Sequence, residues 1–422
     1  MHRLTINQLG PIQHCKLDIR GTTILTGYQA SGKSTIAKAV YFFRSLKEDL
    51  LQLILRRVTE NAASSLLQRD LKTDFEMMVR NKFLNTFGSS YGMDANMTLE
   101  YNYTENTRIG ISLKEAFQSP NYVWVEYSAV FRQFLGSIHS DDIKRDELQR
   151  DLIALFDDPY EAVYIPAGRS ILTLLSGQLN YIYSTMDDMQ KRLLDACTRD
   201  YIERVMKLRP QFSGGLDGLL EGVPVSPAHR KLLGEAQRLI RQVLKGNYSV
   251  VDGEERILID QSRYVKINYA SSGQQESVWI TNLLYYALAL NKKTYFIIEE
   301  PESNLFPESQ KLMIELIALV INAGNNVLLT THSPYVLGAI NNLLYADIVQ
   351  QSSPERVEAI VPRSKWLCTA DCDARFVSNG RADSCMDPEL LQIDNSLIDD
   401  ISHVINEEYD KLYEIETGAK GE

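Results

Sequence analysis

A glycine-bounded loop near the start of the chain has the residue types and spacing that bind phosphate. Residues 27–35 are Gly-Tyr-Gln-Ala-Ser-Gly-Lys-Ser-Thr, between a strand predicted at 22–26 and a helix predicted at 36–45. Backbone N–H groups of such a loop surround phosphate oxygens, and the helix N-terminus adds partial positive charge. Lys33 would then reach the terminal phosphates and Ser34 would ligate Mg²⁺, whereas the alternative is a glycine turn that only caps a helix.

Two adjacent acids follow a second apolar strand, predicted at 294–298. Glu299 and Glu300 are then expected at the carboxyl end of a parallel sheet, where α/β proteins place their sites. The first acid would hold Mg²⁺ through its water shell, and the second would orient and deprotonate an attacking water. A third strand, predicted at 326–331, leads to His332 and is expected at the same edge of the sheet.

A second helix start suited to phosphate occurs at 271–276, Ser-Ser-Gly-Gln-Gln-Glu, ahead of a helix predicted at 277–290. Its hydroxyls, backbone N–H groups and helix dipole favour an anion. Taken by itself, such a segment is more often an ordinary helix cap. Because the chain already has one phosphate-binding loop, a second one is best explained if it serves the nucleotide of a partner molecule.

Together, these motifs resemble those of one family. The segments GYQASGKST, SSGQQE, FIIEEPESNLFPE and LLTTHSPYVL, with the opening LTINQLGPIQHCKLDI, are similar to the ABC-type ATPases of the SMC, RecF and OLD group. The similarity is greatest to the compact AAA-like ATPases of prokaryotic anti-phage systems. It covers residues 1–45 and 255–345, and nothing comparably specific lies between them.

The resemblance implies that ATP and Mg²⁺ are the ligands of these motifs. Glu299, with Ser34, would hold the metal, while Glu300 and the switch histidine His332 would be catalytic. The Walker A residues that the resemblance assigns to nucleotide binding are Gly27, Ala30, Ser31, Gly32, Lys33, Ser34 and Thr35.

The resemblance also implies that each ATP site is shared by two copies of the chain in head-to-tail contact. Ser272, Gly273 and Gln275 match the signature motif that touches the γ-phosphate held by the opposite subunit, and residues 303–305 match the D-loop. The signature departs from the usual LSGGQ at Ser271 and Gln274, where Leu and Gly are expected. This departure bears on the turnover rate more than on the fold.

The predicted fold class is therefore α/β, a P-loop NTPase of the ABC/SMC-head type with an antiparallel β subdomain and a helical insertion. Alternation of apolar and polar residues at 97–101, 108–112 and 122–127 predicts the strands of that subdomain. The predicted divisions are the first part of the head at 1–170, a helical insertion or arm at 171–250, the second part of the head at 251–345, and a tail at 346–422 that packs on the core or a partner.

Two long helices are predicted in the insertion, at 178–208 and 226–246, with a Pro- and Gly-containing break between them. At ~1.5 Å per residue the first would span about 45 Å, which is too short for the coiled coil of a chromosome-organising SMC protein. Arg169 lies just before this region. It either reaches the nucleotide or a partner, or is an arginine of the surface or the packed interior.

The tail holds two groups of residues that suggest metal chemistry. Cys368, Cys372 and Cys385, with His403, suggest zinc, but their loose spacing favours ordinary reduced cysteines. Four aspartates suggest a nuclease metal site, but no accompanying parallel-sheet pattern is evident, so a solvated acidic loop is favoured. They are Asp371, Asp373, Asp383 and Asp387. The stretch 394–417 is amphipathic and acidic, and we expect it to pack on the core or another subunit.

Composition limits the location and the partners. The formal charge of −11 argues against a surface made mainly to coat nucleic acid. Neither a secretion signal nor an apolar run long enough to span a bilayer is evident, and five scattered cysteines do not form a secreted disulfide framework. We therefore expect a cytoplasmic location and no membrane partner.

Two functions remain open from the sequence. The first is an ATPase whose nucleotide state controls a separately encoded effector, such as a nuclease, in prokaryotic anti-phage defence. The alternative is a RecF/SMC-like ATPase of DNA repair or maintenance, whose dimer clamps duplex DNA. The effector, the trigger and any assembly larger than a dimer are not identified by the sequence.

Overall fold

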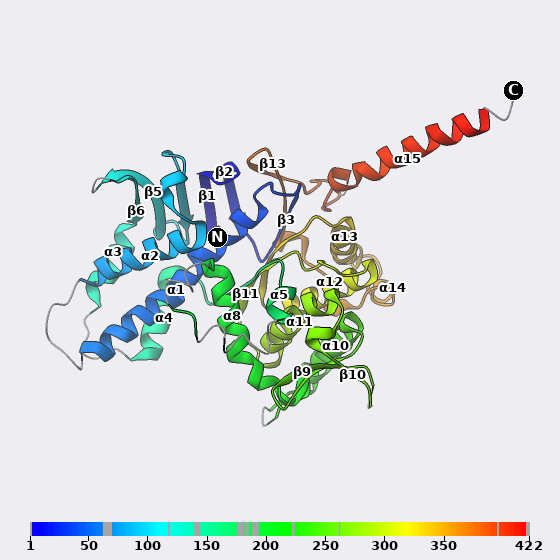
Figure 1. Cartoon of the computed structure of the whole chain (residues 1–422), viewed down its shortest axis with the longest axis horizontal. Helices are drawn as coiled ribbons and strands as arrows, with labels where there is room; N and C mark the ends of the chain where they lie inside the picture. The colour runs from blue at the N-terminus through cyan, green and yellow to red at the C-terminus, as the bar shows by residue number, and fades with distance from the viewer. Residues whose placement is uncertain are drawn as a thin grey trace.

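The computed structural model describes residues 2–61, 70–116, 119–138, 144–174, 181, 185–187, 194–221, 224–260, 262–394 and 396–418. Within these residues the strands form three sheets, and a helix near the C-terminus projects from the body (Figure 1). The described helices of eight or more residues are α1 (Lys33–Asn61), α2 (Leu71–Phe87), α3 (Ala129–Ser137), α4 (Arg145–Phe156), α8 (Ala196–Leu208), α10 (Pro227–Leu244), α11 (Ser272–Ala289), α12 (Pro307–Asn322), α13 (Pro334–Val349) and α15 (Ser396–Gly418). The shorter ones are α5 (Ser170–Leu174), α9 (Gly215–Gly218) and α14 (Pro354–Glu358).

The largest sheet is a mainly parallel one, in the order β14-β13-β3-β12-β11-β7. All neighbours are parallel except β13 and β14, which form an antiparallel hairpin. The predicted P-loop strand, acidic strand and histidine strand are β3, β11 and β12, so their assignment is confirmed. The bounds are β3 (Thr22–Gly27), β7 (Glu161–Ile165), β11 (Thr294–Glu299), β12 (Asn326–Thr330), β13 (Cys372–Ser378) and β14 (Arg381–Ser384).

Strand β13 was not expected from the sequence, which predicted a tail for residues 346–422. It pairs with β3 in parallel register, from Cys372 opposite Thr22 to Val377 opposite Gly27. Asp373 is buried in this strand and bonds to the Arg375 side chain, so the prediction of a solvated loop is wrong for this acid. Part of the predicted tail is therefore a strand of the head's central sheet.

The central sheet separates two hydrophobic clusters. Because side chains alternate along a strand, Tyr295 and Ile297 of β11 face one cluster while Phe296 and Ile298 face the other. The first cluster includes the apolar face of α1 and the antiparallel sheet; the second includes α10, α11, α12 and α13. This sandwich explains why the middle of β11, residues 295–298, is apolar and buried on both faces.

The predicted antiparallel subdomain is confirmed, and the N-terminal hairpin belongs to it. Its five strands have the order β2-β1-β4-β5-β6, with every neighbouring pair antiparallel. A smaller antiparallel sheet, in the order β10-β9-β8, precedes α11. The bounds are β1 (His2–Leu9), β2 (Ile12–Ile19), β4 (Thr98–Asn102), β5 (Arg108–Ala116), β6 (Ser119–Tyr127), β8 (Asn247–Val251), β9 (Glu254–Leu258) and β10 (Tyr264–Lys266).

The helical insertion differs from the continuous helix predicted at 178–208. Helix α8 begins at Ala196, because Asp195 has an extended backbone and its carboxylate accepts the N–H groups of Cys197 and Thr198. Much of 175–193 lies outside the described residues. Helix α10 packs on α11 and α12 rather than extending from the body as an arm.

Helix α15 projects away from the body at the red end of the chain in Figure 1. The predicted packing on the core is not seen for its described side chains, whereas packing on another subunit remains a prediction. Its exposed apolar residues are Val404, Ile405, Tyr409, Leu412, Tyr413 and Ile415. In the part of the chain that the structure describes, no helix has the length and apolarity needed to cross a membrane.

The junction of β3 and β13 depends on a glycine. Gly27 has φ of 135°, and a Cβ atom added to it would lie 2.2 Å from the carbonyl oxygen of Val377. We expect Gly27→Ala to reduce the free energy of unfolding by about 3 kcal/mol, since both strain and overpacking follow. Chemical denaturation measures this loss.

Gly253→Ala is the matched control. Gly253 also has a positive φ, 75°, but nothing lies within 4 Å of an added Cβ. It should therefore lose only about 1–2 kcal/mol, from the backbone conformation alone. Equal losses in the two variants would show that the approach of β13 to Gly27 does not constrain the fold.

Candidate functional site

The nucleotide motifs meet because their strands run parallel and end at one edge of the central sheet. A cavity of about 520 Å³ lies at this edge, within the range of ligand pockets. The loop after β3, Glu300 after β11 and His332 after β12 all contribute to its wall. The lining residues are Pro11, Gly27, Tyr28, Gln29, Ala30, Ser31, Gly32, Lys33, Ser34, Thr35, Glu300, His332 and Phe376. All seven Walker A residues expected from the sequence are among them.

The phosphate-binding loop is shaped by its glycines and by the N-terminal hairpin. Gly32 has φ of 109°, and an added Cβ would lie 2.4 Å from Cδ1 of Ile12, so the β1–β2 hairpin presses directly on the loop. Ala30 adopts φ of 59°, which is uncommon for a residue with a side chain. The hydroxyl of Ser31 is buried without a described protein partner. These close contacts restrict the conformations that the loop can adopt.

Lys33 is the only lysine or arginine among the described residues that line this cavity. Its Nζ atom donates to the carbonyl oxygens of Gly27 and Tyr28, each at 2.7 Å. Burial lowers the pKa of the ammonium group, while the carboxylates of Glu300, Glu302 and Glu299 act in the opposite direction. A bound phosphate would offer Lys33 an anionic partner in place of two neutral carbonyls.

Glu299 has the features of a magnesium ligand. Its carboxylate is buried; Oε2 accepts the N–H of Ala167 at 3.2 Å, and Oε1 has no hydrogen-bond partner among the described residues. An unpaired buried carboxylate oxygen is costly unless a cation or an ordered water completes it. Together with the exposed hydroxyl of Ser34, it supplies the oxygen donors that Mg²⁺ prefers, with waters completing the shell.

Glu300 is held in an unusual backbone conformation. Its φ is 44°, in the left-handed region that residues with side chains rarely adopt. The Glu300 N–H donates to the carbonyl oxygen of Thr330 at 3.0 Å, and Oε2 accepts the Ser303 hydroxyl at 3.2 Å. The side chain remains partly exposed and faces the cavity, which suits a base that must reach a water molecule.

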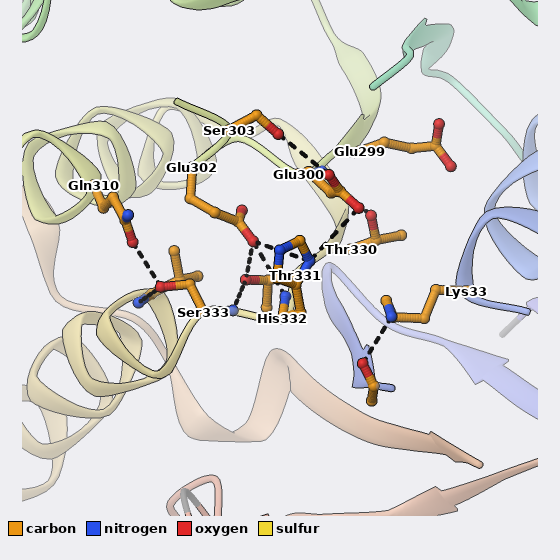
Figure 2. A network of polar contacts seen from close by, with 12 residues as sticks. Lys33, Glu299, Glu300, Glu302, Ser303, Gln310, Thr330, Thr331, His332 and Ser333 are labelled. Atoms are coloured by element: carbon orange, nitrogen blue, oxygen red, sulfur yellow. Dashed lines mark hydrogen bonds and ion pairs between the residues drawn. The ribbon is translucent and has the colours of Figure 1, made fainter. Parts of the chain in front are cut away.

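A small polar network connects His332 to the acids of the β11 loop, as Figure 2 shows. His332 Nδ1 lies 3.5 Å from Glu300 Oε1 and 4.0 Å from Glu302 Oε1. Glu302 is buried and accepts the Thr331 hydroxyl at 2.6 Å and the His332 N–H at 3.1 Å. Burial raises the pKa of Glu302. The sequence did not single out this acid, which fixes the backbone of the histidine segment.

In the signature segment, residues 271–276, the two residues that depart from the usual sequence, Ser271 and Gln274, bond to each other. Ser271 and Gln274 form a capping box in which the Ser271 side chain accepts the Gln274 N–H and Gln274 Oε1 accepts the Ser271 N–H at 3.0 Å. The Gln274 amide also donates to the Leu244 carbonyl at 2.8 Å, which ties this helix start to α10. Ser272 is exposed one residue into the helix.

Two other signature residues, Gly273 and Gln275, make contacts with other segments of the same chain. Gly273 packs against the D-loop: an added Cβ would lie 2.6 Å from the carbonyl oxygen of Asn304. The expectation that Gln275 faces a partner's nucleotide is wrong for this structure. Gln275 is buried, and its amide donates to the Ile267 carbonyl at 3.0 Å, because the fourth residue of this helix points into the core.

The sequence left the role of Arg169 open and gave no role to Glu276. Arg169 is fully buried, so a surface role and a direct reach to the nucleotide are both excluded in this structure. Its partner is Glu276 of the signature segment, with Nε 3.3 Å from Oε2. A buried arginine requires a carboxylate partner, but the distance of 107 residues between the two in the chain gives no pattern to recognise.

Two of the tail cysteines belong to the β13–β14 region: Cys372 begins β13 and Cys385 directly follows β14. Among the described residues no group of three or more His, Cys, Asp or Glu side chains is arranged to hold a metal ion, and the His403 side chain lies outside those described. Cys372 and Cys385 are buried, which raises the pKa of each thiol to about 12. Both sulfurs are therefore protonated at neutral pH.

Comparisons with known proteins give one family match, over part of the chain, and several similar solved structures. Residues 231–337 match the family described as AAA ATPase domain, and no curated protein matches the chain. The SMC head domain from Thermotoga maritima is 13 % identical, covers 80 % of this chain and 90 % of its own, and gives a TM-score of 0.35. An SmcHead bound to the C-winged helix domain of ScpA is 12 % identical, with coverage of 80 % and 90 % and a TM-score of 0.38. An Smc head domain with an extended coiled coil, bound to the C-terminal domain of ScpA derived from Pyrococcus furiosus, is 10 % identical, with coverage of 91 % and 96 % and a TM-score of 0.38.

The AAA ATPase match runs from α10 into α13 and includes the signature segment, Glu299, Glu300 and His332. It supports the prediction of an ATPase for this part of the chain. The anti-phage subgroup remains a prediction.

The geometry separates the roles of the two adjacent acids. Glu300→Gln keeps the shape of the side chain but removes a base, so we expect hydrolysis to fall by ~10²–10⁴ with little change in the Kd of Mg-ATP. Glu299→Gln removes a buried anion and should instead weaken Mg-dependent nucleotide binding. Phosphate release and equilibrium binding of a fluorescent ATP analogue measure the two effects. Normal hydrolysis by Glu300→Gln would show that another group is the base.

Proposed function

We propose that this chain is an ABC-type ATPase that hydrolyses Mg-ATP at sites shared between two copies. The observation that carries the proposal is the position of the signature segment. Ser272 is exposed, yet none of the described residues 271–276 lines the cavity around Lys33 of the same chain. A helix start with phosphate-binding character that does not reach its own nucleotide cavity is available to that of a second copy.

The surface around the signature segment supports pairing with another copy. Three aromatic side chains follow or precede the nucleotide motifs and are largely exposed: Tyr269 at 78 %, Phe306 at 75 % and Tyr335 at 58 %. Contacts link the three motifs into one surface, because Gly273 packs on Asn304 and Gln310 contacts both the Leu305 carbonyl and Ser333. Exposed aromatic residues are frequent anchors of protein interfaces.

Each residue then has one task in hydrolysis. Lys33 and the backbone N–H groups of its loop bind the β and γ phosphates, and Glu300 accepts the proton of the attacking water. Glu299 and Ser34 would hold Mg²⁺, which would supply positive charge against the negative charge of the phosphates. Ser272 of the second copy completes the site from the opposite side, and His332 orients Glu300 across the gap of 3.5 Å.

We further propose that this ATPase controls a separately encoded effector in anti-phage defence. It comes from the resemblance of the motifs to compact defence ATPases. The product of the neighbouring gene should co-purify with this chain, and protection of cells against phage should be lost with Lys33→Ala. Tight, strongly salt-dependent binding of duplex DNA with no co-purifying protein would favour the DNA-maintenance alternative.

Mixing two inactive variants tests the shared site. Lys33→Ala removes a phosphate contact, and Ser272→Arg blocks the helix start that would meet the partner's phosphate. Each variant alone should be nearly inactive. A mixture should regain activity, since one heterodimer site combines the intact Lys33 of one copy with the intact Ser272 of the other.

Size-exclusion chromatography with light scattering establishes that the heterodimers form. Lys33→Ala mixed with Glu300→Gln is the matched control: the site that retains Lys33 then lacks its base, so activity should stay absent. No recovery in demonstrated heterodimers of Lys33→Ala and Ser272→Arg would refute the shared site.

A further inference from the structure

The Arg169 side chain makes several hydrogen bonds and an ion pair close to the cavity. It lies between β7 and α5 with no exposed surface. Its guanidinium donates to four backbone carbonyls: Glu276 at 3.0 Å, Glu299 at 2.7 Å, Glu300 at 3.0 Å and Pro166. A planar group with five donors can make such a set of contacts, whereas the single ammonium of a lysine cannot.

Glu276 holds Arg169 from the side of the signature segment. Its two carboxylate oxygens accept the backbone N–H groups of Arg169 and Ser170, each at 3.0 Å, in addition to the ion pair with the guanidinium. The Thr173 hydroxyl donates to the Gln275 carbonyl at 2.9 Å and reinforces the same contact. The first turns of α11 and the 166–173 segment are thus bonded through both side chains and backbone.

On its other side, the Arg169 guanidinium bonds to the backbone of Glu300, the proposed catalytic base. Glu300 has φ of 44°, and such a conformation persists only where the surroundings hold it. The Glu300 N–H donates to Thr330 of β12, and the Glu300 carbonyl accepts both the Arg169 guanidinium and the Ser303 N–H, the latter at 3.1 Å. Arg169 therefore supplies one of the backbone hydrogen bonds that keep Glu300 facing the cavity.

We infer that Arg169 and Glu276 are positioning residues that couple the signature end of α11 to the catalytic Glu300 of the same chain. This inference rests on the proposed function, in which the signature segment meets the nucleotide of a second copy. Docking of α11 on that nucleotide moves Glu276, Arg169 follows because it is bonded to Glu276, and the Glu300 backbone follows Arg169. Occupation of one shared site thereby sets the base of the other, so that hydrolysis is cooperative in ATP.

Stability alone does not account for this arrangement. Burial of an ion pair removes two charges from water, and well-packed apolar side chains of similar volume usually stabilise a protein at least as well. The four carbonyls belong to three separate segments: the end of β7, the first turn of α11 and the end of β11. A group that bonds all three fixes their relative positions.

Arg169→Lys tests the coupling, with Arg44→Lys as the matched control. Arg44 is also buried and paired with an acid, Asp158 at 2.8 Å, but on α1 and away from the cavity. We expect Arg169→Lys to lower kcat by about 100-fold, because a small displacement of the base has this effect, and to bring the Hill coefficient for ATP towards unity. The Kd of ATP should be almost unchanged in both variants, and Arg44→Lys should retain the wild-type Hill coefficient.

Hydrogen exchange gives a readout that needs no activity. In the nucleotide-free protein, amides of residues 299–305 should exchange at least tenfold faster in Arg169→Lys than in the wild type, because Glu300 loses an anchor. Arg44→Lys should leave exchange in this segment unchanged. If Arg169→Lys fails to fold, Glu276→Gln decides, since it keeps the side-chain volume while it removes the ion pair and one acceptor. It should lower the Hill coefficient and speed the same exchange, with a smaller loss of kcat.

The outcomes separate this inference from the proposed function. Folded Arg169→Lys and Glu276→Gln proteins with wild-type exchange, kcat and Hill coefficient would overturn it, even if Lys33→Ala and Ser272→Arg complement each other. A wild-type Hill coefficient of unity at saturating protein would overturn the cooperative coupling in the same way. If the coupling holds, complementation should be partial, because α11 of the copy that keeps Lys33 carries Ser272→Arg and meets no bound nucleotide. Complete absence of recovery in demonstrated heterodimers would overturn the shared site, whereas faster exchange of 299–305 would still support the positioning of Glu300 by Arg169.

Discussion

The parallel pairing of β3, β12 and β11 is the constraint on which the site depends. The register sets Leu25 opposite Thr330 and Thr330 opposite Glu299, so that the carboxyl ends of the three strands lie at one edge of the sheet, with β3 two residues longer. Residues more than 260 positions apart in the chain, Lys33 and Glu300, therefore line one cavity. Burial of the sheet on both faces, by α1 and the antiparallel sheet on one and α10 to α13 on the other, fixes this register.

The sequence was sufficient where a local pattern carried the information. The loop from Gly27 to Thr35, the strand before Glu299 and the strand before His332 were all predicted within a residue or two, because glycine spacing and continuous apolar runs are visible in the chain itself. The alternating strands of the antiparallel subdomain were recognised for the same reason.

The remaining features depend on contacts between distant segments. Strand β13 has a short, mixed sequence that includes Cys, Asp and Arg, and its pairing with β3 requires that Gly27 lack a side chain. The signature motif predicts that Gln275 contacts a ligand. Its position in the helix instead turns the side chain inward, where its amide donates to the Ile267 carbonyl. The contact between Arg169 and Glu276 joins segments whose proximity follows from the fold alone. Tertiary structure thus assigns roles that residue type and spacing leave open.

In the proposed dimer, each nucleotide is bound by two copies of this chain. The most direct test is an experimental structure of the Glu300→Gln protein with Mg-ATP. We expect a head-to-tail dimer in which every ATP contacts Lys33 of one copy and Ser272 of the other. An ATP enclosed by a single chain, with Ser272 exposed to solvent, would contradict it.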